Sequence, residues 1–354
     1  MKLLVSVGTR PNFIKITRFK SVAKSLGINL QIVHTGQHYD QNMANIFFDQ
    51  FNLRPDHFIS LKETSPAGQI GEMVVELSQL ISREKPDVLL TPGDVNSTLA
   101  AGIAANKSSI PLAHLESGLR SQDRSMPEEI NRILVDDLSD FLFVTEDSGM
   151  QNLKNAGVPA ERIHFVGNTM IDTLVAFNRE IEASSILKRY RIKPGEFVLM
   201  TMHRPATVDH ASGLGLIIDI IKSIAPLKVV FPIHPRTIDR LHQFKLKQDL
   251  TNLPNLILSE PMGYFDFQKL VANAKFILTD SGGIQEESTF KKVPCITIRP
   301  NTERPITCDI GTNQLVDSNI NSILSAIQNI DVSQSRIPEL WDGFATERVL
   351  SVFK

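Results

Sequence analysis

The sequence predicts an α/β protein with two successive parallel sheets. Short apolar runs of strand length alternate with stretches of helical character, as in strands that are joined by crossover helices. The alternation pauses after residue 168 and restarts near residue 195. A chain of 354 residues also exceeds what one hydrophobic core usually fills. We therefore expect two Rossmann-like lobes, at 1–170 and 171–335, and a last helix within 336–354 that packs back on the first lobe.

Six apolar runs define the expected first sheet. Each is apolar nearly throughout and ends in small or polar residues, which is typical of parallel strands buried on both faces. Two stretches between them, 69–83 and 97–106, have helical character. The six runs lie at 2–9, 30–36, 87–94, 110–117, 141–146 and 163–168.

The second lobe follows a helical, partly charged stretch at 171–191 and the turn signal KPGE at 193–196. Helices are expected again at 319–330 and 345–353. We expect about five or six strands in each sheet. The strand-like runs are FVLMTMH at 197–203, KVVFPIHP at 228–235, NLILSEP at 255–261, KFILTDSG at 275–282 and PCITIRP at 294–300.

The composition excludes several classes of protein. The formal net charge is −2, whereas proteins that bind nucleic acid or anionic membranes usually carry an excess of Lys and Arg, so we expect neither partner. Cys295 and Cys308 are too few for a disulfide framework or a cysteine-based zinc site, which favours a reducing, cytoplasmic compartment. No apolar run approaches the roughly 18 residues of a membrane span, and the N-terminal run is expected to be a strand rather than a signal peptide.

Charged side chains concentrate at the ends of the expected strands. Ligands of open parallel sheets bind at the carboxyl ends of the strands, so we expect the active site in a cleft between the lobes. The first lobe offers Arg10 with Lys15, Gln37 and His38, Asp94, and His114 and Glu116 followed by Glu128. The second lobe offers His203 and Arg204, His234, and Asp280 to Gly283 followed by Glu286 and Glu287.

The turn Ser281-Gly282-Gly283 predicts an anion site. It leaves backbone N–H groups unobstructed at the start of a helix, where the helix dipole favours a phosphate. Glu286 or Glu287, one turn later, is placed to accept hydrogen bonds from ribose hydroxyls. The alternative is an ordinary tight strand–helix turn. The chain has neither a GxGxxG nor a GxxxxGK[ST] motif, so a dinucleotide redox site or a P-loop is not expected.

Structural roles are the alternative for several of the other residues. Asp94 could be the N-cap of the helix that starts near residue 96, and His114 could be a satisfied core histidine. Glu116 directly follows a buried strand, where a carboxylate is costly unless it is paired or used. His203 and His234 could form a metal pair, but no third ligand follows at a recognisable spacing, so no metal is expected.

Ordered motifs along the chain resemble a known enzyme family. They are Gly8 to Pro11 with Ile14 and Lys15, Gly36 to His38, Gly93 and Asp94, Glu116 to Arg120, Pro127 to Arg132, Val166 to Asp172, His203 and Arg204, Thr279 to Glu287, Thr302 to Pro305, and Trp341 to Gly343. Together they are similar to the non-hydrolysing UDP-N-acetylglucosamine 2-epimerases. The resemblance implies the two-lobed GT-B fold, no cofactor and no catalytic metal.

The resemblance also implies a reaction and the residues that perform it. UDP-GlcNAc and UDP-ManNAc would be interconverted by removal of the C2 proton, anti elimination of UDP to 2-acetamidoglucal, and re-addition on the opposite face. The carboxylates of Asp94, Glu116 and Glu128 would act as acids and bases. His203 would lie beside the diphosphate or leaving group, Arg10 and Lys15 would stabilise developing charge, and Arg10 and Arg204 would bind substrate. Ser281, Gly282 and Gly283 would hold the diphosphate, and Glu287 would bind the ribose.

Further expectations follow from the same resemblance. Gln37, His38, Gln69 and His234 resemble positions that hold a second, activating UDP-GlcNAc in some bacterial members, and members are commonly homodimers that serve the synthesis of surface polysaccharide. The chain departs from the family after His203, where it reads RPATVD, and at Ile306, where many members have a Glu. A related UDP-2-acetamido sugar, with a C3-amino or uronic acid group, is therefore the alternative substrate. A GT-B glycosyltransferase and a catalytically silent nucleotide-sugar sensor are the alternative functions.

Overall fold

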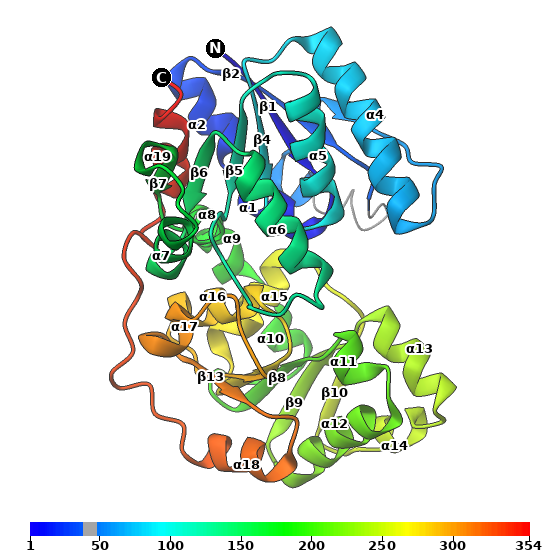
Figure 1. Cartoon of the computed structure of the whole chain (residues 1–354). Coiled ribbons are helices and arrows are strands. Elements are labelled where there is room, and N and C mark those ends of the chain that lie inside the picture. The colour runs from blue at the N-terminus through cyan, green and yellow to red at the C-terminus, as the bar shows by residue number, and fades with distance from the viewer. Residues whose placement is uncertain (38–47) are drawn as a thin grey trace. The chain divides into compact units, whose positions relative to one another are not determined.

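The computed structural model describes residues 1–37 and 48–354 and divides them into two compact units (Figure 1). The first unit comprises Met1–Ala176 together with Glu339–Lys354, and the second comprises Phe177–Pro338. The division follows α8 (Thr169–Ala176) rather than the expected residue 170, because α8 packs against helices of the first unit.

All strands of the first unit form one parallel sheet. Its seven strands within the described residues have the order β3-β2-β1-β4-β5-β6-β7. The six predicted strands are confirmed. The sheet has one strand more than the expected five or six, because the two-residue edge strand β3 has no apolar run from which it could be predicted. The strands are β1 (Lys2–Val7), β2 (Asn29–His34), β3 (His57–Phe58), β4 (Val88–Pro92), β5 (Leu112–Leu115), β6 (Phe141–Val144) and β7 (Ile163–Phe165).

Helices cover the first sheet, and both predicted helices are present. The long helices α4, α5 and α6 lie side by side in the order of the chain. Their apolar residues, such as Leu77, Ala104 and Val135, form a core with strand residues such as Leu4 and Leu89. Besides α8, the helices are α1 (Arg10–Lys15), α2 (Phe19–Leu26), α4 (Pro66–Glu84), α5 (Asn96–Lys107), α6 (Pro127–Leu138), α7 (Asp147–Asn155) and the 3-10 turn η1 (Ala160–Arg162).

The C-terminal segment belongs to the first unit. Helix α19 (Ala345–Ser351) packs against α2 and α8. Its start is fixed by the carboxylate of Asp172, which accepts hydrogen bonds from the backbone N–H of Ala345 and from the N–H and hydroxyl of Thr346. The buried indole of Trp341 donates to the carbonyl of Thr145 at 3.0 Å. These buried bonds give the last residues a defined place in the fold.

Aromatic rings surround His34, the last residue of β2. Its side chain is buried, and its ring stacks on Phe13 and Phe58 at centroid distances of 5.5 and 5.0 Å. The Nδ1 atom accepts a hydrogen bond from the N–H of Gly36. Burial lowers the pKa of His34 from its ordinary 6.5 to about 4. The imidazole is therefore neutral in the native protein at pH 7.

Acid should destabilise the first unit through His34. Between pH 6.5 and 4 the unfolded chain binds a proton that the folded one rejects, so this contribution to stability is intact above pH 6.5 and is lost as the pH falls towards 4. The full difference is about 3 kcal/mol. Denaturant unfolding of His34→Asn, measured from pH 7.5 to 4.5, should show a flatter pH dependence than the parent. The exposed His242→Asn serves as control, and an unchanged slope in His34→Asn would contradict the assignment.

The second unit repeats the parallel arrangement. Its six strands have the order β10-β9-β8-β11-β12-β13 within the described residues. All five predicted strands are confirmed, and β13, whose sequence NQLV is too polar to stand out, is the sixth. The strands are β8 (Phe197–Thr201), β9 (Lys228–Pro232), β10 (Leu256–Ser259), β11 (Phe276–Thr279), β12 (Cys295–Ile298) and β13 (Asn313–Val316).

Two cores form on opposite faces of this sheet because neighbouring residues of a strand point to opposite sides. In β8, Val198 and Met200 pack into the core that includes α12, whereas Phe197 and Leu199 pack into the core that includes α15. The helices are α9 (Asn178–Ala183), α10 (Ile186–Arg189), α11 (Pro205–Val208), α12 (Ala211–Ser223), α13 (Pro235–Gln243), α14 (Lys247–Thr251), α15 (Tyr264–Asn273), α16 (Gly283–Lys291), α17 (Ile306–Asp309) and α18 (Ile320–Gln328). Among the described residues, no helix has the length and apolar character needed to cross a membrane.

The strand orders locate the switch point of each sheet. In the first, β1 lies between β2 and β4, so the loops after β1 and β4 diverge to opposite sides. In the second, β8 lies between β9 and β11, and the loops after β8 and β11 diverge in the same way. Ligands of open parallel sheets bind beside such loops. Among the predicted site residues, the ones on or next to these two pairs of loops are Arg10, Asp94, His203, Arg204 and Ser281 to Gly283.

Candidate active site

Asn12 joins the loop after β1 to the end of β4. Its buried side-chain oxygen accepts hydrogen bonds from the N–H and hydroxyl of Thr9, at 3.2 and 2.7 Å. Its amide nitrogen donates to the carbonyl of Pro92 at 2.9 Å. Arg10 therefore starts α1 from a loop of fixed geometry, and Lys15 at the other end of this short helix is buried.

Lys15 and Glu116 form a buried ion pair. The Lys15 Nζ and the Glu116 Oε2 are 2.6 Å apart, and the two residues are only 6% and 5% exposed. Glu116 also has a left-handed backbone with φ of 72°, a conformation that is strained for a residue with a side chain and that concentrates at functional sites. The ammonium of Lys15 thus neutralises the charge of the Glu116 carboxylate. Burial of this carboxylate had no explanation from the sequence alone.

Asp94 and Glu129 share one arginine. The Arg132 guanidinium pairs with the Asp94 carboxylate and, at 2.5 Å, with the Glu129 carboxylate. Glu129 also accepts hydrogen bonds from the N–H and hydroxyl of Ser121. The N-cap position of α5 is Val95, and no side chain caps that helix. Asp94 is therefore not the N-cap, because its carboxylate is directed to Arg132.

The other predicted residues of the first unit lie on separate elements. Glu128 is in the first turn of α6, and Gln69 is on α4. The Gln37 side-chain oxygen accepts from the N–H of Ser97 at 2.7 Å, in the first turn of α5. His38 lies outside the described residues. Gln37 and Gln69 thus lie at different elements, and their shared role as an activator site stays a prediction.

Asp280 organises the strand ends of the second unit. Its fully buried carboxylate accepts hydrogen bonds from the backbone N–H of His203 and of Arg204, at 2.9 to 3.1 Å. The His203 Nδ1 lies 3.3 Å from the Asp280 Oδ1, and the His234 ring is 5.4 Å from that of His203. Burial lowers the pKa of His203, and the charges of Arg204 and Arg236 act in the same direction while Asp280 opposes them. A neutral imidazole is therefore favoured.

The turn from β11 into α16 has the strand–turn–helix geometry that was expected for Ser281 to Gly283. Helix α16 begins at Gly283, directly after Ser281 and Gly282. A β-carbon at Gly282 would lie 2.8 Å from both the Arg304 Nη1 and the Glu303 Oε1, so a side chain there would displace the buried ends of these two residues. The backbone N–H groups of the first turn are thus left for an anion.

A buried ion network supports this turn. Arg304 pairs with Glu286 at 2.8 Å and with Glu303 at 2.6 Å, and Arg299 pairs with Glu303 at 3.0 Å. All four residues are at least nine-tenths buried. Glu287 lies near a different residue, the buried Tyr264. Burial raises the pKa of the Tyr264 hydroxyl, and the negative charge of Glu287 raises it further. Since Glu286 is committed to Arg304, Glu287 is the better candidate for a ribose contact.

Loss of Arg304 should strongly destabilise the second unit. Arg304→Ala removes the guanidinium from beside the buried Glu286 carboxylate and one of the two guanidinium groups from Glu303, which keeps Arg299, and breaking a buried pair in this way costs about 3–5 kcal/mol. The free energy of unfolding, from denaturant titration, measures the loss. Arg54→Ala is the matched control, because Arg54 and its partner Asp49 are exposed and such surface pairs contribute about 0–1 kcal/mol. Equal stability of the two variants would contradict the role of the network.

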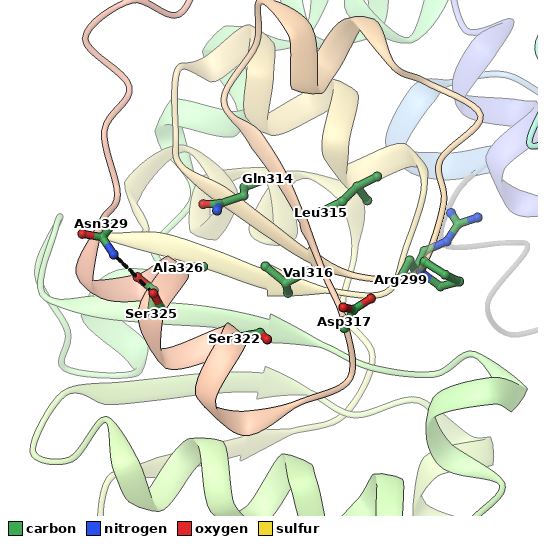
Figure 2. Close-up of a pocket in the computed structure, with 10 residues that line it drawn as sticks. Arg299, Gln314, Leu315, Val316, Asp317, Ser322, Ser325, Ala326 and Asn329 are labelled. Atoms are coloured by element: carbon green, nitrogen blue, oxygen red, sulfur yellow. Dashed lines mark hydrogen bonds between the residues drawn. The ribbon is translucent and has the colours of Figure 1, made fainter.

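One pocket of the second unit is separate from these groups (Figure 2). It has a volume of about 370 Å³ and lies between β13 and α18, with Gln314, Ser322, Ser325 and Asn329 among its lining residues. Arg299 also lines it, but its guanidinium points away from the serines and bonds Asn301 and Glu303. Arg299 is therefore the one residue that this pocket shares with the ion network of Glu286, Glu303 and Arg304.

The partners of the predicted residues were mostly absent from the sequence-based prediction. Arg132, Glu129 and Asp280 all lie within quoted motifs, yet the motifs alone gave them no role. The spacing of Glu129 and Arg132, three residues apart in an expected helix, was an available signal for an ion pair. Within the described parts of the chain, no three His, Cys, Asp or Glu residues are grouped to hold a metal ion.

Comparisons with known proteins place these features in a family. The family model described as UDP-N-acetylglucosamine 2-epimerase matches residues 20–354. The chain is 39% identical to the UDP-N-acetylglucosamine 2-epimerase of Methanocaldococcus jannaschii over 93% of this chain and 92% of that protein. It is 38% identical to the UDP-2,3-diacetamido-2,3-dideoxy-D-glucuronate 2-epimerase of Pseudomonas aeruginosa over 89% and 88% of the two chains.

Solved structures agree with the sequence relatives. The crystal structure of the Methanocaldococcus jannaschii UDP-GlcNAc 2-epimerase in complex with UDP-GlcNAc and UDP has a TM-score of 0.92 and 37% identity, over 100% of this chain and 99% of that one. That of Neisseria meningitidis UDP-GlcNAc 2-epimerase bound to UDP-GlcNAc has a TM-score of 0.90 and 28% identity, over 100% and 99%.

The fold defines a class of enzyme. The two parallel α/β units match the GT-B-like epimerase structures. Both the predicted α/β class with two parallel sheets and the resemblance drawn from the motifs are confirmed. The chain belongs to the UDP-N-acetylglucosamine 2-epimerase family.

Proposed function

We propose that this chain interconverts UDP-GlcNAc and UDP-ManNAc by inverting C2 of the sugar. The observation that carries the proposal is the buried Lys15–Glu116 pair, in which the carboxylate is held on a left-handed backbone. A strained, paired carboxylate at a strand end serves proton transfer better than it serves stability. The membership of the family supplies the reaction class.

The reaction needs groups that move one proton on each face of C2. A carboxylate takes the C2 proton while the C1–O bond breaks and UDP leaves, which gives 2-acetamidoglucal. The reverse addition then delivers a proton to the opposite face and re-forms the C1–O bond. We assign these transfers to Asp94, Glu116 and Glu128, in agreement with the need for two acids or bases of different environment.

Cations of the first unit stabilise charge that develops during elimination. Lys15 is held by Glu116, so its ammonium is positioned before substrate arrives and costs no reorganisation during the reaction. Arg10 starts α1 from a fixed loop, binds substrate and stabilises the developing charge.

His203 of the second unit lies beside the diphosphate. Burial lowers its pKa, so it acts there as a neutral hydrogen-bonding group.

The second unit holds UDP. The N–H groups of Gly282 and Gly283 and the hydroxyl of Ser281, whose own N–H donates to Thr279, take the diphosphate at the start of α16, and the Glu287 carboxylate accepts hydrogen bonds from the ribose. Arg204 adds a guanidinium whose backbone is fixed by Asp280. These roles need no metal or redox cofactor.

A related sugar is the second candidate substrate. The glucuronate epimerase relative is almost as similar to this chain as the UDP-GlcNAc epimerase relative, at 38% against 39% identity. The altered segment after His203 and Ile306 are in the unit that we assign to UDP binding. Incubation with UDP-GlcNAc, UDP-ManNAc and the diacetamido uronate in separate tubes, followed by proton NMR, tests the choice. Turnover of the uronate alone would replace UDP-GlcNAc as the substrate, and transfer to an added acceptor would indicate a glycosyltransferase.

Four finer assignments complete the proposal. The protein is a cytoplasmic homodimer whose product feeds surface polysaccharide, as in its family. A second UDP-GlcNAc acts as activator through Gln37, His38, Gln69 and His234. Light scattering tests the dimer, and an initial rate that depends on UDP-GlcNAc with a Hill coefficient above 1 tests the activator. A monomer, or a hyperbolic rate curve, would remove the respective assignment.

A further inference from the structure

A buried histidine–aspartate pair lies beneath the strand ends of the first unit. His114 in β5 is completely buried, and Asp136 in α6 is 1% exposed. The His114 Nδ1 is 2.7 Å from the Asp136 Oδ1, and the His114 Nε2 is 2.7 Å from the carbonyl oxygen of Gly93. Neither residue is assigned a part in the proposed chemistry.

Both ring nitrogens of His114 face hydrogen-bond acceptors. The carbonyl of Gly93 can only accept, so Nε2 carries a hydrogen. Burial by itself would raise the pKa of Asp136, but the hydrogen bonds and charges of His114 and Arg120 outweigh it and hold that pKa below its ordinary value. The same carboxylate pairs with the Arg120 guanidinium and accepts from the N–H of Gly118, both of which favour its ionised, accepting form, so Nδ1 carries a hydrogen as well.

The pair connects the two loops that carry Asp94 and Glu116. Through Nε2 it holds the peptide group between Gly93 and Asp94. The second carboxylate oxygen of Asp136 accepts from the N–H of Gly118, at 3.1 Å, and pairs with Arg120 at 2.7 Å, and thus holds the loop after β5. One rigid unit of helix, strand and two loops results.

Gly93 is sensitive to small movements. Its φ is 76°, and a β-carbon there would lie 3.1 Å from the Lys15 Nζ, so the backbone of Gly93 packs directly against the Lys15–Glu116 pair. A shift of the Gly93 carbonyl would therefore move Asp94 and, at the same time, loosen the contact of Gly93 with the Lys15–Glu116 pair. A misplacement of about 1 Å at reacting groups can cost on the order of 100-fold in rate.

We propose that His114, protonated on both ring nitrogens and anchored by Asp136, is a positioning residue that holds the Gly93–Asp94 turn for catalysis. The proposal rests on the proposed role of Asp94 in proton transfer. A purely structural role would instead make His114 important for stability and leave the chemical step of the folded enzyme unchanged.

Two variants separate the hydrogen bonds of His114. The amide nitrogen of Asn comes closest to Nδ1 and that of Gln to Nε2, so His114→Asn keeps a donor to Asp136 and His114→Gln keeps a donor to Gly93. We expect kcat to fall about 10- to 100-fold in His114→Asn, with KM nearly unchanged, and to fall clearly less in His114→Gln. Equal losses in both variants, or a normal kcat in His114→Asn, would overturn the proposal.

A spectroscopic measurement on the parent enzyme does not depend on the variants or on activity. In protein with ¹⁵N-labelled histidine, the ring of His114 should show two N–H groups protected from exchange with water. The signals are assigned by their absence from the His114→Asn spectrum or, if that variant does not fold, from the His114→Gln spectrum. A single ring N–H would overturn the proposal. Failure of the proposed function would instead appear as a parent enzyme that lacks epimerase activity while both N–H groups are present.

Discussion

Glu116→Gln is expected to lower kcat by about 1,000-fold, because a positioned acid or base usually contributes between 100- and 10,000-fold. Glutamine preserves the shape of the side chain but cannot exchange a proton at C2. It also leaves the buried Lys15 without its anion, so we expect a loss of stability of about 3–5 kcal/mol. Steady-state kinetics with UDP-GlcNAc and denaturant unfolding measure the two effects.

A double variant separates catalysis from stability. In Lys15→Met/Glu116→Gln both charges of this pair are removed together, so neither is left buried without the other. A large part of the stability that is lost in Glu116→Gln should therefore return. The rate should stay low, because neither the acid or base nor the cation is restored. Recovery of kcat along with stability would show that Glu116 is only a structural partner of Lys15.

Asp94→Asn should reduce kcat by about 100- to 10,000-fold while UDP binds with nearly parental affinity. The variant keeps the size of the side chain and removes its charge, and we assign UDP to the other unit. Calorimetric titration with UDP and a kinetic assay of the same preparation give both quantities.

Asp331→Asn is the matched control for this variant, since Asp331 is exposed in the second unit and accepts a hydrogen bond from the N–H of Ser333, two residues further along the chain. It should have normal turnover. A parental rate in Asp94→Asn, or a loss of UDP affinity as large as the loss of rate, would remove Asp94 from the chemical step.

The fold was predictable to the extent that buried strands are apolar. Parallel strands covered on both faces have apolar sequences of four to eight residues, and all eleven predicted runs are strands. The two strands that were not predicted lie at sheet edges, where β3 has two residues and β13 reads NQLV. Short or polar edge strands carry too weak a pattern to be found from local sequence. The boundary after α8 depends on packing, which local sequence does not contain.

The positions of the candidate residues could be predicted better than their pairing. The strand-end rule selected Lys15, Asp94 and Glu116 as candidates because they lie on or soon after loops that directly follow apolar runs. It could not find that Lys15 meets Glu116, since the two are 101 residues apart and no local pattern relates them. For the same reason Arg304 was not recognised as the partner of Glu286, and the residue types alone did not separate Glu286 from Glu287, which only the resemblance placed on the ribose. Long-range ion pairs become visible only in three dimensions.

The most direct test of the proposed chemistry is proton NMR of the enzyme with UDP-GlcNAc in deuterated water. We expect a UDP-ManNAc signal to appear and deuterium to enter C2 of both sugars, because the C2 proton is removed by a group that exchanges with solvent. Formation of UDP-ManNAc with complete retention of the C2 proton would contradict a deprotonation by Asp94, Glu116 or Glu128 that exchanges with solvent. The absence of both product and exchange would contradict the assignment of UDP-GlcNAc as substrate.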